Sequence, residues 1–269
     1  MENSNFLQMA KYLLKLEKSA YKKCKKIKIK VTDKGFKDLL TTMDTTIEKY
    51  LISSLSKDFP GVKIVSEEFN SKVKAEGTYF SVDPVDGTVN FANNLIDLWA
   101  IQIAYVENDV TVASAIYLPK FGEYYAAKGV GAFKNGKSFK VQQKSPEHSL
   151  VCIDSDSNAS DCKIINALDK KVLRFRALGA GCIHSTMTAE GNLGGFVEFD
   201  GHSWDLLSGF LLMEEAGCVR KSVFGHHIFA NTEELLTIIE DALKETTTER
   251  HKRAKWKTKA ALPQNIKKK

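Results

Sequence analysis

The sequence has no apolar run long enough to cross a membrane. A spanning helix needs about 20 consecutive apolar residues, whereas the richest stretch, Leu95–Val106, is short and interrupted by Asp97 and Gln102. The N-terminus carries polar residues and lacks the apolar stretch and small-residue cleavage site of a secretory signal. We therefore expect no membrane partner.

Paired cysteines are also lacking. Disulfide frameworks and zinc cages need paired or clustered cysteines, but the five present are widely scattered and form no Cys-x-x-Cys pair. This spacing predicts reduced thiols and a cytoplasmic protein. The five are Cys24, Cys152, Cys162, Cys182 and Cys218.

Two common catalytic motifs are missing as well. Neither the phosphate-binding P-loop nor the G-x-S-x-G nucleophile elbow occurs. The histidines are too dispersed to predict a metal-ligand set, and packing or surface positions explain them more simply. They include His184, His202, His226 and His227.

Positive charge is concentrated at the C-terminal end. The net charge is +6, but residues 250–269 hold nine Lys or Arg and no acid, which leaves 30 basic and 33 acidic residues in the body. A nucleic-acid-binding domain instead lines a folded face with basic residues. Residues 250–269 therefore read as a basic, flexible tail, with a nucleic acid or acidic partner as the alternative.

Hydrophobic periodicity predicts mixed sheets covered by helices. The second helix is expected to begin near Asp44, with Thr45 and Glu48 as its capping box. Asn135-Gly136 predicts a tight hairpin turn. The predicted helices are 4–24, one from about Asp44 onward, Cys162–Asp169, Cys182–Glu190, Trp204–Ala216 (closed by Gly217) and Glu233–Leu243. The predicted strands are Lys63–Ser66, Thr78–Val82, Ile101–Val106, Val110–Tyr117, Glu123–Ala127, Ser149–Ile153, Arg174–Leu178 and Gly195–Phe199.

The segment Asp83–Phe91, DPVDGTVNF, carries the strongest functional signal. A strand delivers Asp83 at its end, Asp86 follows three residues later, and Gly87 lets the backbone approach a ligand closely. Thr88 then opens a predicted helix. Carboxylates beside free backbone amides suit a hard cation and a phosphate, although Asp, Pro and Gly also form ordinary turns.

Further acids complete a candidate metal site. Glu67 and Glu68 end a strand, Asp205 lies in the first turn of an apolar helix, and Asp44 heads another. Each also has a plain structural explanation, because strand-end acids are often solvated and acids complement a helix N-terminus. Together, oxygen ligands without His or Cys favour magnesium over zinc. No basic residue lies near these motifs in sequence, so the clustered acids call for a cation.

The order of Asp44, Glu67-Glu68, DPVDGTVNF and the WDLLSG run at Trp204–Gly209 resembles the inositol monophosphatase family of lithium-sensitive, magnesium-dependent phosphatases. The resemblance covers residues 34 to 243. It implies an α/β (α+β) fold built as a layered αβαβα sandwich, and a homodimer. It also implies one catalytic domain, 1–249, with two packed lobes of roughly 1–145 and 146–249.

The resemblance also assigns roles to individual residues. It implies two or three Mg²⁺ ions per active site, held by Glu67, Asp83, Asp86, Asp205 and the Val85 carbonyl. Glu67, Thr88 and Asp44 would orient the attacking water, which displaces the leaving group in line. The residues expected to touch substrate are Asp86, Gly87, Thr88, Gly181, Cys182, Glu198 and Asp205. For the GAGC segment, Gly179–Cys182, the start of a helix is an equal alternative explanation.

The expected substrate is a small polyol or sugar phosphate, most simply inositol monophosphate. Asn90-Phe91 resembles the inositol and fructose-bisphosphate branch, and Glu198 suits several hydroxyls. Departures from the family at Asn93–Asp97 and Asp154–Ser160 keep fructose 1,6-bisphosphate, histidinol phosphate and a nucleotide 3′-phosphate open. The alternative to an enzyme is a non-enzymatic interaction protein that reaches RNA or nucleic-acid-bound machinery through the basic tail.

Overall fold

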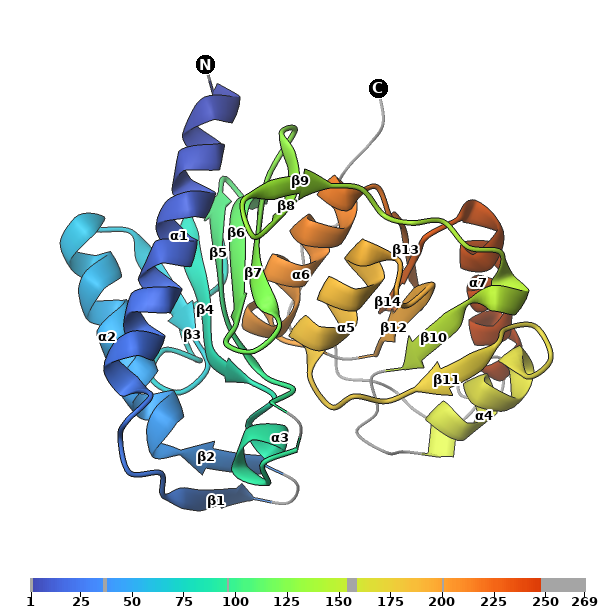
Figure 1. The fold of residues 1–269 in the computed structure, drawn as a ribbon, viewed down its shortest axis with the longest axis horizontal. Coiled ribbons are helices and arrows are strands. Elements are labelled where there is room, and N and C mark those ends of the chain that lie inside the picture. Colours follow the sequence, from blue (N-terminus) through green and yellow to red (C-terminus); the bar gives the residue numbers. More distant parts are fainter. Residues whose placement is uncertain (1, 36–37, 96, 154–158, 200, 248–269) are drawn as a thin grey trace.

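Five layers of secondary structure make up the protein in a computed structural model, which describes residues 2–35, 38–95, 97–153, 159–199 and 201–247 (Figure 1). Helices cover the outer face of each of two large sheets, and two more helices fill the space between the sheets. This confirms the predicted αβαβα sandwich. Within these ranges no helix is long and apolar enough to cross a bilayer.

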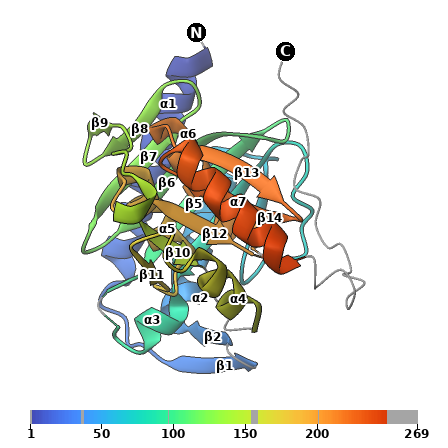
Figure 2. The same cartoon turned by 90° about the vertical axis from the view of Figure 1, so that its right-hand side faces the viewer.

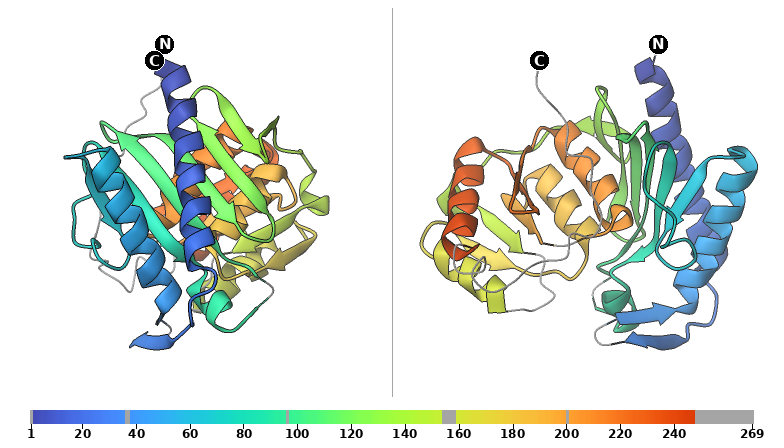
Figure 3. Two further views of the ribbon diagram at one scale, coloured as in Figure 1. Left: turned by 60° about the vertical axis from the view of Figure 1, so that its left-hand side comes forward. Right: turned by 180° about the vertical axis from the view of Figure 1, so that it is seen from behind.

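The first layer consists of two helices, α1 (Glu2–Cys24) and α2 (Thr42–Asp58), which lie side by side on one sheet (Figure 3). A two-stranded hairpin, β1 (Val31–Gly35) and β2 (Asp38–Thr41), connects them. The predicted capping box of α2 is wrong. Thr41 and Asp44 cap the helix instead, because the Asp44 carboxylate accepts hydrogen bonds from the backbone and side chain of Thr41.

The second layer is a seven-stranded sheet in the order β3-β4-β5-β6-β7-β8-β9. Only β3 and β4 pair in parallel; the other neighbours are antiparallel. The predicted Asn135-Gly136 turn is confirmed between β8 and β9, with positive φ at both residues, as a tight hairpin turn requires. The strands are β3 (Lys63–Ser66), β4 (Tyr79–Asp86), β5 (Ala100–Glu107), β6 (Val110–Leu118), β7 (Gly122–Ala127), β8 (Gly131–Lys134) and β9 (Lys137–Phe139).

The middle layer contains α5 (Gly181–Glu190) and α6 (Ser203–Ala216), which pack against each other between the sheets. Their axes approach closely at Gly209. A Cβ added there would lie 2.5 Å from Ser185 Oγ, so only glycine fits at this crossing. The first turns of both helices lie beside the end of β4, from which the short helix α3 (Thr88–Ala92) leads away.

The last two layers are a five-stranded sheet, ordered β11-β10-β12-β14-β13, and two outer helices (Figure 2). The sheet is β10 (Leu150–Ile153), β11 (Arg174–Arg176), β12 (Gly195–Glu198), β13 (Val219–Val223) and β14 (His226–Ala230). The helices are α4 (Ala159–Leu168) and α7 (Glu233–Thr247), and a 3₁₀ turn, Pro146–His148, precedes β10. The sequence patterns gave no prediction for β1, β2, β13 or β14.

Candidate metal centre and active site

Strand β4 ends at an irregularity that brings two carboxylates to the same side. Its pairing with β5 shifts register between Asp83 and Asp86, so the strict alternation of side chains is interrupted there. Gly87 follows with φ +91°, and a Cβ at this position would lie 2.7 Å from the Leu98 carbonyl oxygen. The turn therefore requires glycine, both for its backbone conformation and for space.

A cavity of about 180 Å³ opens at this turn. It is lined from β2, the end of β3, the β4–α3 turn, the loop before α5 and the first turn of α6. Its lining residues are Asp38, Leu39, Glu67, Asp83, Val85, Asp86, Gly87, Thr88, Val89, Gly179 and Asp205. The predicted acids Glu67, Asp83, Asp86 and Asp205 thus converge on one cavity although 138 positions separate the first from the last.

Asp86 is fixed by three donors from two other elements, α5 and β5. The backbone amides of Gly181 and Cys182, at the start of α5, donate to its two oxygens. The buried Gln102 side chain on β5 donates to Asp86 Oδ2 at 3.1 Å and lies 3.5 Å from Asp83 Oδ2. The two amides therefore orient a predicted metal ligand, and their direct contact with substrate stays a prediction.

Gln102 was missed by the sequence reasoning, which noted it only as a break in an apolar run. A buried polar side chain in a central strand needs partners, and its register partner on β4 is Asp83. Its amide also lies 3.4 Å from the Asp205 carbonyl oxygen. Gln102 therefore connects β4 with α6, and its position in the middle of an apolar strand was the available signal.

The loop that carries Glu67 is held in place by the side chain of Glu48 on α2. Glu48 is fully buried and accepts hydrogen bonds from the Ser66 hydroxyl and from the backbone amides of Glu68 and Phe69. The backbone on both sides of Glu67 is thereby held. The predicted capping role of Glu48 is wrong because its oxygens bind this loop; its spacing of four residues from Asp44 places both on the same face of α2.

One basic residue does reach the acidic cluster, contrary to the expectation from sequence. Lys34 Nζ on β1 lies 3.3 Å from Glu67 Oε1 and 2.9 Å from Glu68 Oε1. The hairpin β1–β2 carries it there from 33 positions away. Lys34 offsets part of the charge at the edge of the cluster, whereas the hydrogen bonds of Asp83 and Asp86 come from neutral donors.

Thr88 and Asp44 form a hydrogen-bonded pair at the cavity wall. Thr88 Oγ1 lies 2.9 Å from Asp44 Oδ1 and 2.8 Å from the Val85 carbonyl oxygen. A hydroxyl has one proton, so it donates to one of these oxygens at a time. When it donates to Asp44, the Val85 carbonyl is available to a cation and the Thr88 lone pairs can accept a proton.

The cavity carries more negative charge than its surroundings stabilise. Burial and the nearby charges of Glu67, Asp86, Asp205 and Asp44 raise the pKa of Asp83 well above its usual value. Burial, with a contribution from Glu68, raises the pKa of Glu67 to about 8. A positive charge placed among such carboxylates would stabilise their ionised forms, which is the property expected of a cation site.

The donor set fits a hard divalent cation. Four carboxylates and one carbonyl provide only oxygen, as magnesium prefers. The nearby Cys182 thiol stays protonated because burial and Asp86 raise its pKa well above the usual value. Among the described residues no three acidic, His or Cys side chains are already arranged as a closed metal cage. Side-chain adjustment, including release from Lys34, would therefore accompany binding.

Four predicted site residues, Asp44, Gly181, Cys182 and Glu198, are not among the residues that line the cavity. Asp44, Gly181 and Cys182 lie directly behind the wall, where they bond Thr88 or Asp86. Glu198 is buried at the end of β12, opposite His227 on β14. Its contact with substrate hydroxyls stays a prediction. The basic tail, 250–269, and most of Asp154–Ser160 lie outside the described residues.

Fold and cavity together define an αβαβα protein with an oxygen-lined, acidic site for a hard cation. A model described as the inositol monophosphatase family matches residues 4–258. A protein of Aquifex aeolicus named fructose-1,6-bisphosphatase/inositol-1-monophosphatase is 32% identical over 231 residues, 81% of this chain and 86% of that protein.

Solved structures agree. The chain superimposes on an IMPase from Thermotoga maritima with a TM-score of 0.78 and 26% identity, covering 93% of this chain and 99% of that one. An IMPase/NADP phosphatase complexed with Mg²⁺ and phosphate shares the fold, with a TM-score of 0.79, 22% identity and coverages of 89% and 96%. The chain belongs to the inositol monophosphatase family and is a phosphatase of this metal-dependent family.

Proposed function

We propose that the protein is a magnesium-dependent phosphomonoesterase acting on a small polyol or sugar phosphate, most simply inositol monophosphate. The observation that carries this proposal is the convergence of Glu67, Asp83, Asp86 and Asp205 on the cavity that Thr88 also lines. The Aquifex aeolicus relative is named for both fructose 1,6-bisphosphate and inositol 1-phosphate, so both substrates belong in the first test.

The residues present can bind two or three Mg²⁺ ions. Glu67, Asp83, Asp86, Asp205 and the Val85 carbonyl would hold these ions, since all five residues line the cavity. When bound, magnesium supplies charge neutralisation of the phosphate and lowers the pKa of a coordinated water. The solved relative described with Mg²⁺ and phosphate supports this choice of cofactor.

The chain's own groups position the nucleophile. Thr88 Oγ1 donates a hydrogen bond to Asp44 Oδ1 at 2.9 Å and accepts a hydrogen bond from the attacking water. As the water attacks, its proton passes to Thr88 Oγ1, the Thr88 proton passes to Asp44, and Asp44 releases it to solvent. Glu67 accepts a second hydrogen bond from that water. The water attacks phosphorus in line with the ester oxygen, the P–O ester bond breaks, and solvent protonates the departing alkoxide. Backbone amides of Gly87 and Thr88 are the proposed phosphate donors, while Gly181, Cys182 and Glu198 are proposed to contact the polyol.

Phosphate release with Mg²⁺ and with EDTA tests the proposal. The panel is inositol 1-phosphate, fructose 1,6-bisphosphate, histidinol phosphate and adenosine 3′,5′-bisphosphate. We expect magnesium-dependent turnover, highest for the first or second compound, with one ¹⁸O entering phosphate per turnover in labelled water. Magnesium-independent turnover, or a stable phosphorylated protein, would refute the mechanism.

We further propose a homodimer in the cytoplasm. The family resemblance supports the dimer, and the free state of the buried cysteines Cys24, Cys152, Cys182 and Cys218 supports a reducing compartment. Light scattering of the full chain in solution tests the dimer, and a mass of 30.0 kDa would contradict it.

A further inference from the structure

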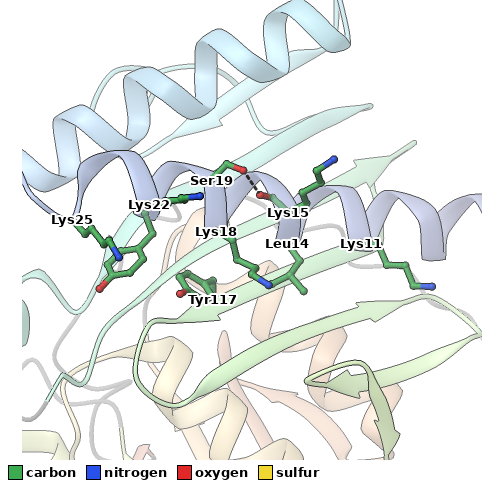
Figure 4. Close-up of a pocket in the computed structure, with 9 residues that line it drawn as sticks. Lys11, Leu14, Lys15, Lys18, Ser19, Lys22, Lys25 and Tyr117 are labelled. Carbon is green, nitrogen blue, oxygen red and sulfur yellow. Dashed lines mark hydrogen bonds between the residues drawn. The ribbon is translucent and has the colours of Figure 1, made fainter.

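Helix α1 presents a stripe of lysines on the outside of the molecule. Lys11, Lys15, Lys18 and Lys22 on α1, with Lys25 just past its end, follow one another every three or four residues, which places them on one side of the helix. At a rise of 1.5 Å per residue this lysine stripe is about 21 Å long. Figure 4 shows it from Lys25 at one end to Lys11 at the other.

The charge of the lysine stripe is largely uncompensated. Every exposed side chain between positions 11 and 25 is a lysine, and the acid in this stretch, Glu17, is fully buried. Lys18 pairs with Glu123 at 2.5 Å; in the part of the chain that the structure describes, the other four stripe lysines form no ion pair. Like charges four residues apart destabilise a helix. Folding alone therefore disfavours this arrangement.

A groove runs beside the lysine stripe. It encloses about 550 Å³ and is lined by the five lysines together with Leu14, Ser19, Tyr21 and Tyr117. The two tyrosine rings lie edge to face, with centroids 5.6 Å apart. The groove thus combines a row of cations with half-buried aromatic surface, and it shares no lining residue with the cavity at Asp83.

We propose that this groove binds single-stranded nucleic acid. The lysines would contact successive phosphates, and a base would stack on the exposed part of Tyr117 or Tyr21, as bases stack on aromatic side chains in single-strand-binding proteins. Phosphates advance about 3.4 Å along a stacked strand, so the stripe spans about six nucleotides. The net charge of the protein without residues 250–269 does not reveal this basic surface, because the acidic residues that balance it lie elsewhere on the molecule.

Two other anionic partners fit the groove less well. A membrane-binding helix needs large apolar side chains beside its lysines, but Leu14 is only 8% exposed and the stripe has no other aliphatic neighbour in the groove. An acidic peptide would match the charge and leave the tyrosine rings unused. Both become outcomes of the test.

Fluorescence anisotropy of a labelled mixed-sequence 12-nucleotide RNA, titrated with the full chain in EDTA, measures binding without turnover. The stripe variant replaces Lys11, Lys15, Lys22 and Lys25 with Gln. The control replaces Lys57, Lys72, Lys120 and Lys171 with Gln, which removes the same charge from exposed positions elsewhere. We expect the stripe variant alone to bind at least tenfold more weakly at 50 mM salt.

The salt dependence separates contact with the lysine stripe from general attraction. Each lost phosphate contact lowers the slope of log K against log salt by about 0.7 for a single strand, so four lost contacts lower it by about 3. Tyr117→Leu should weaken binding severalfold with the slope unchanged. Unchanged magnesium-dependent phosphatase activity in the stripe variant would show that this variant is correctly folded.

Four outcomes would overturn the proposal. Equal losses of RNA affinity in the stripe and control variants would show that the binding is nonspecific charge attraction. Loss only on removal of residues 250–269 would assign binding to the tail. Equal affinity for a 12-residue poly-glutamate would favour an acidic protein partner. Stripe-dependent sedimentation with anionic vesicles, without RNA binding, would favour a membrane surface.

Discussion

Lys34 Nζ lies 3.3 Å from Glu67 Oε1, so a side chain of the protein already contacts one of the proposed magnesium ligands. The contact places an ammonium at the rim of the acidic cavity, where it offsets charge in the metal-free protein. A cation that binds Glu67 must displace this ammonium or share the carboxylate with it. Lys34 and magnesium are therefore expected to compete.

Lys34→Met should tighten magnesium binding. A partly exposed charge interaction is worth about 1 kcal/mol, which corresponds to about a fivefold change in a binding constant. Isothermal titration with Mg²⁺ measures the change, and Lys34→Arg, which keeps the charge, is the control. Weaker binding in the Met variant would show that Lys34 assists the metal site.

Asp83→Asn should abolish nearly all magnesium-dependent activity and still stabilise the metal-free protein. Asp83 is only 2% exposed, and burial with neighbouring acids raises its pKa, so its charge at neutral pH opposes folding. The gain at neutral pH is expected to be on the order of 1 kcal/mol or more. Thermal unfolding in EDTA measures the stability of the metal-free protein, thermal unfolding in Mg²⁺ measures the stabilisation by the metal, and phosphate release measures activity. Activity or a magnesium-induced stabilisation equal to the wild type would contradict the site.

Thr88→Val should lower kcat by about 10²–10⁴-fold, the usual contribution of a positioned proton acceptor. The valine keeps the volume and removes the hydroxyl that bonds Asp44 Oδ1. Because Thr88 is not a proposed metal ligand, Mg²⁺ affinity should change little, and Thr88→Ser should recover much of kcat. A parallel loss of Mg²⁺ affinity in the Val variant would indicate a structural role.

Glu17 should make stability fall as pH rises. Glu17 is a fully buried residue of α1, and burial raises its pKa well above 4.5, with a smaller opposing effect from the Ile103 backbone. Between about pH 4.5 and the raised pKa the folded state holds a proton that the unfolded state has lost, so stability is fully present below pH 4.5 and declines above it. Glu17→Gln should therefore stabilise at pH 8 and have little effect at pH 4, as denaturant unfolding can measure. A destabilised variant at pH 8 would contradict the argument.

Local signals in the sequence predicted most of the layers. Strands such as Val110–Leu118 and helices such as Ser203–Ala216 have long, strongly apolar patterns, and their positions are confirmed within a residue or two. The hairpin of β13 and β14 was not predicted because its turn, Phe224-Gly225, lacks the Asn-Gly or Asp-Gly signature, although both residues have positive φ.

The acids of the site could be predicted because each lies at the end of a recognisable element. Their supports could not, since they depend on contacts between distant segments. Gln102 reaches Asp86 only through strand register, Glu48 reaches the Glu68 amide across 20 positions, and Lys34 arrives on a hairpin with no apolar pattern.

The close packing of α5 against α6 at Gly209 determines the geometry of the proposed metal site. Helix α5 provides the two amides on Asp86 and helix α6 carries Asp205, so the spacing between these helices sets the spacing of the ligands. Since even a methyl group at position 209 would meet Ser185, a small increase in bulk there would widen the gap between the helices. Loss of activity can therefore originate at a residue that never meets solvent, metal or substrate.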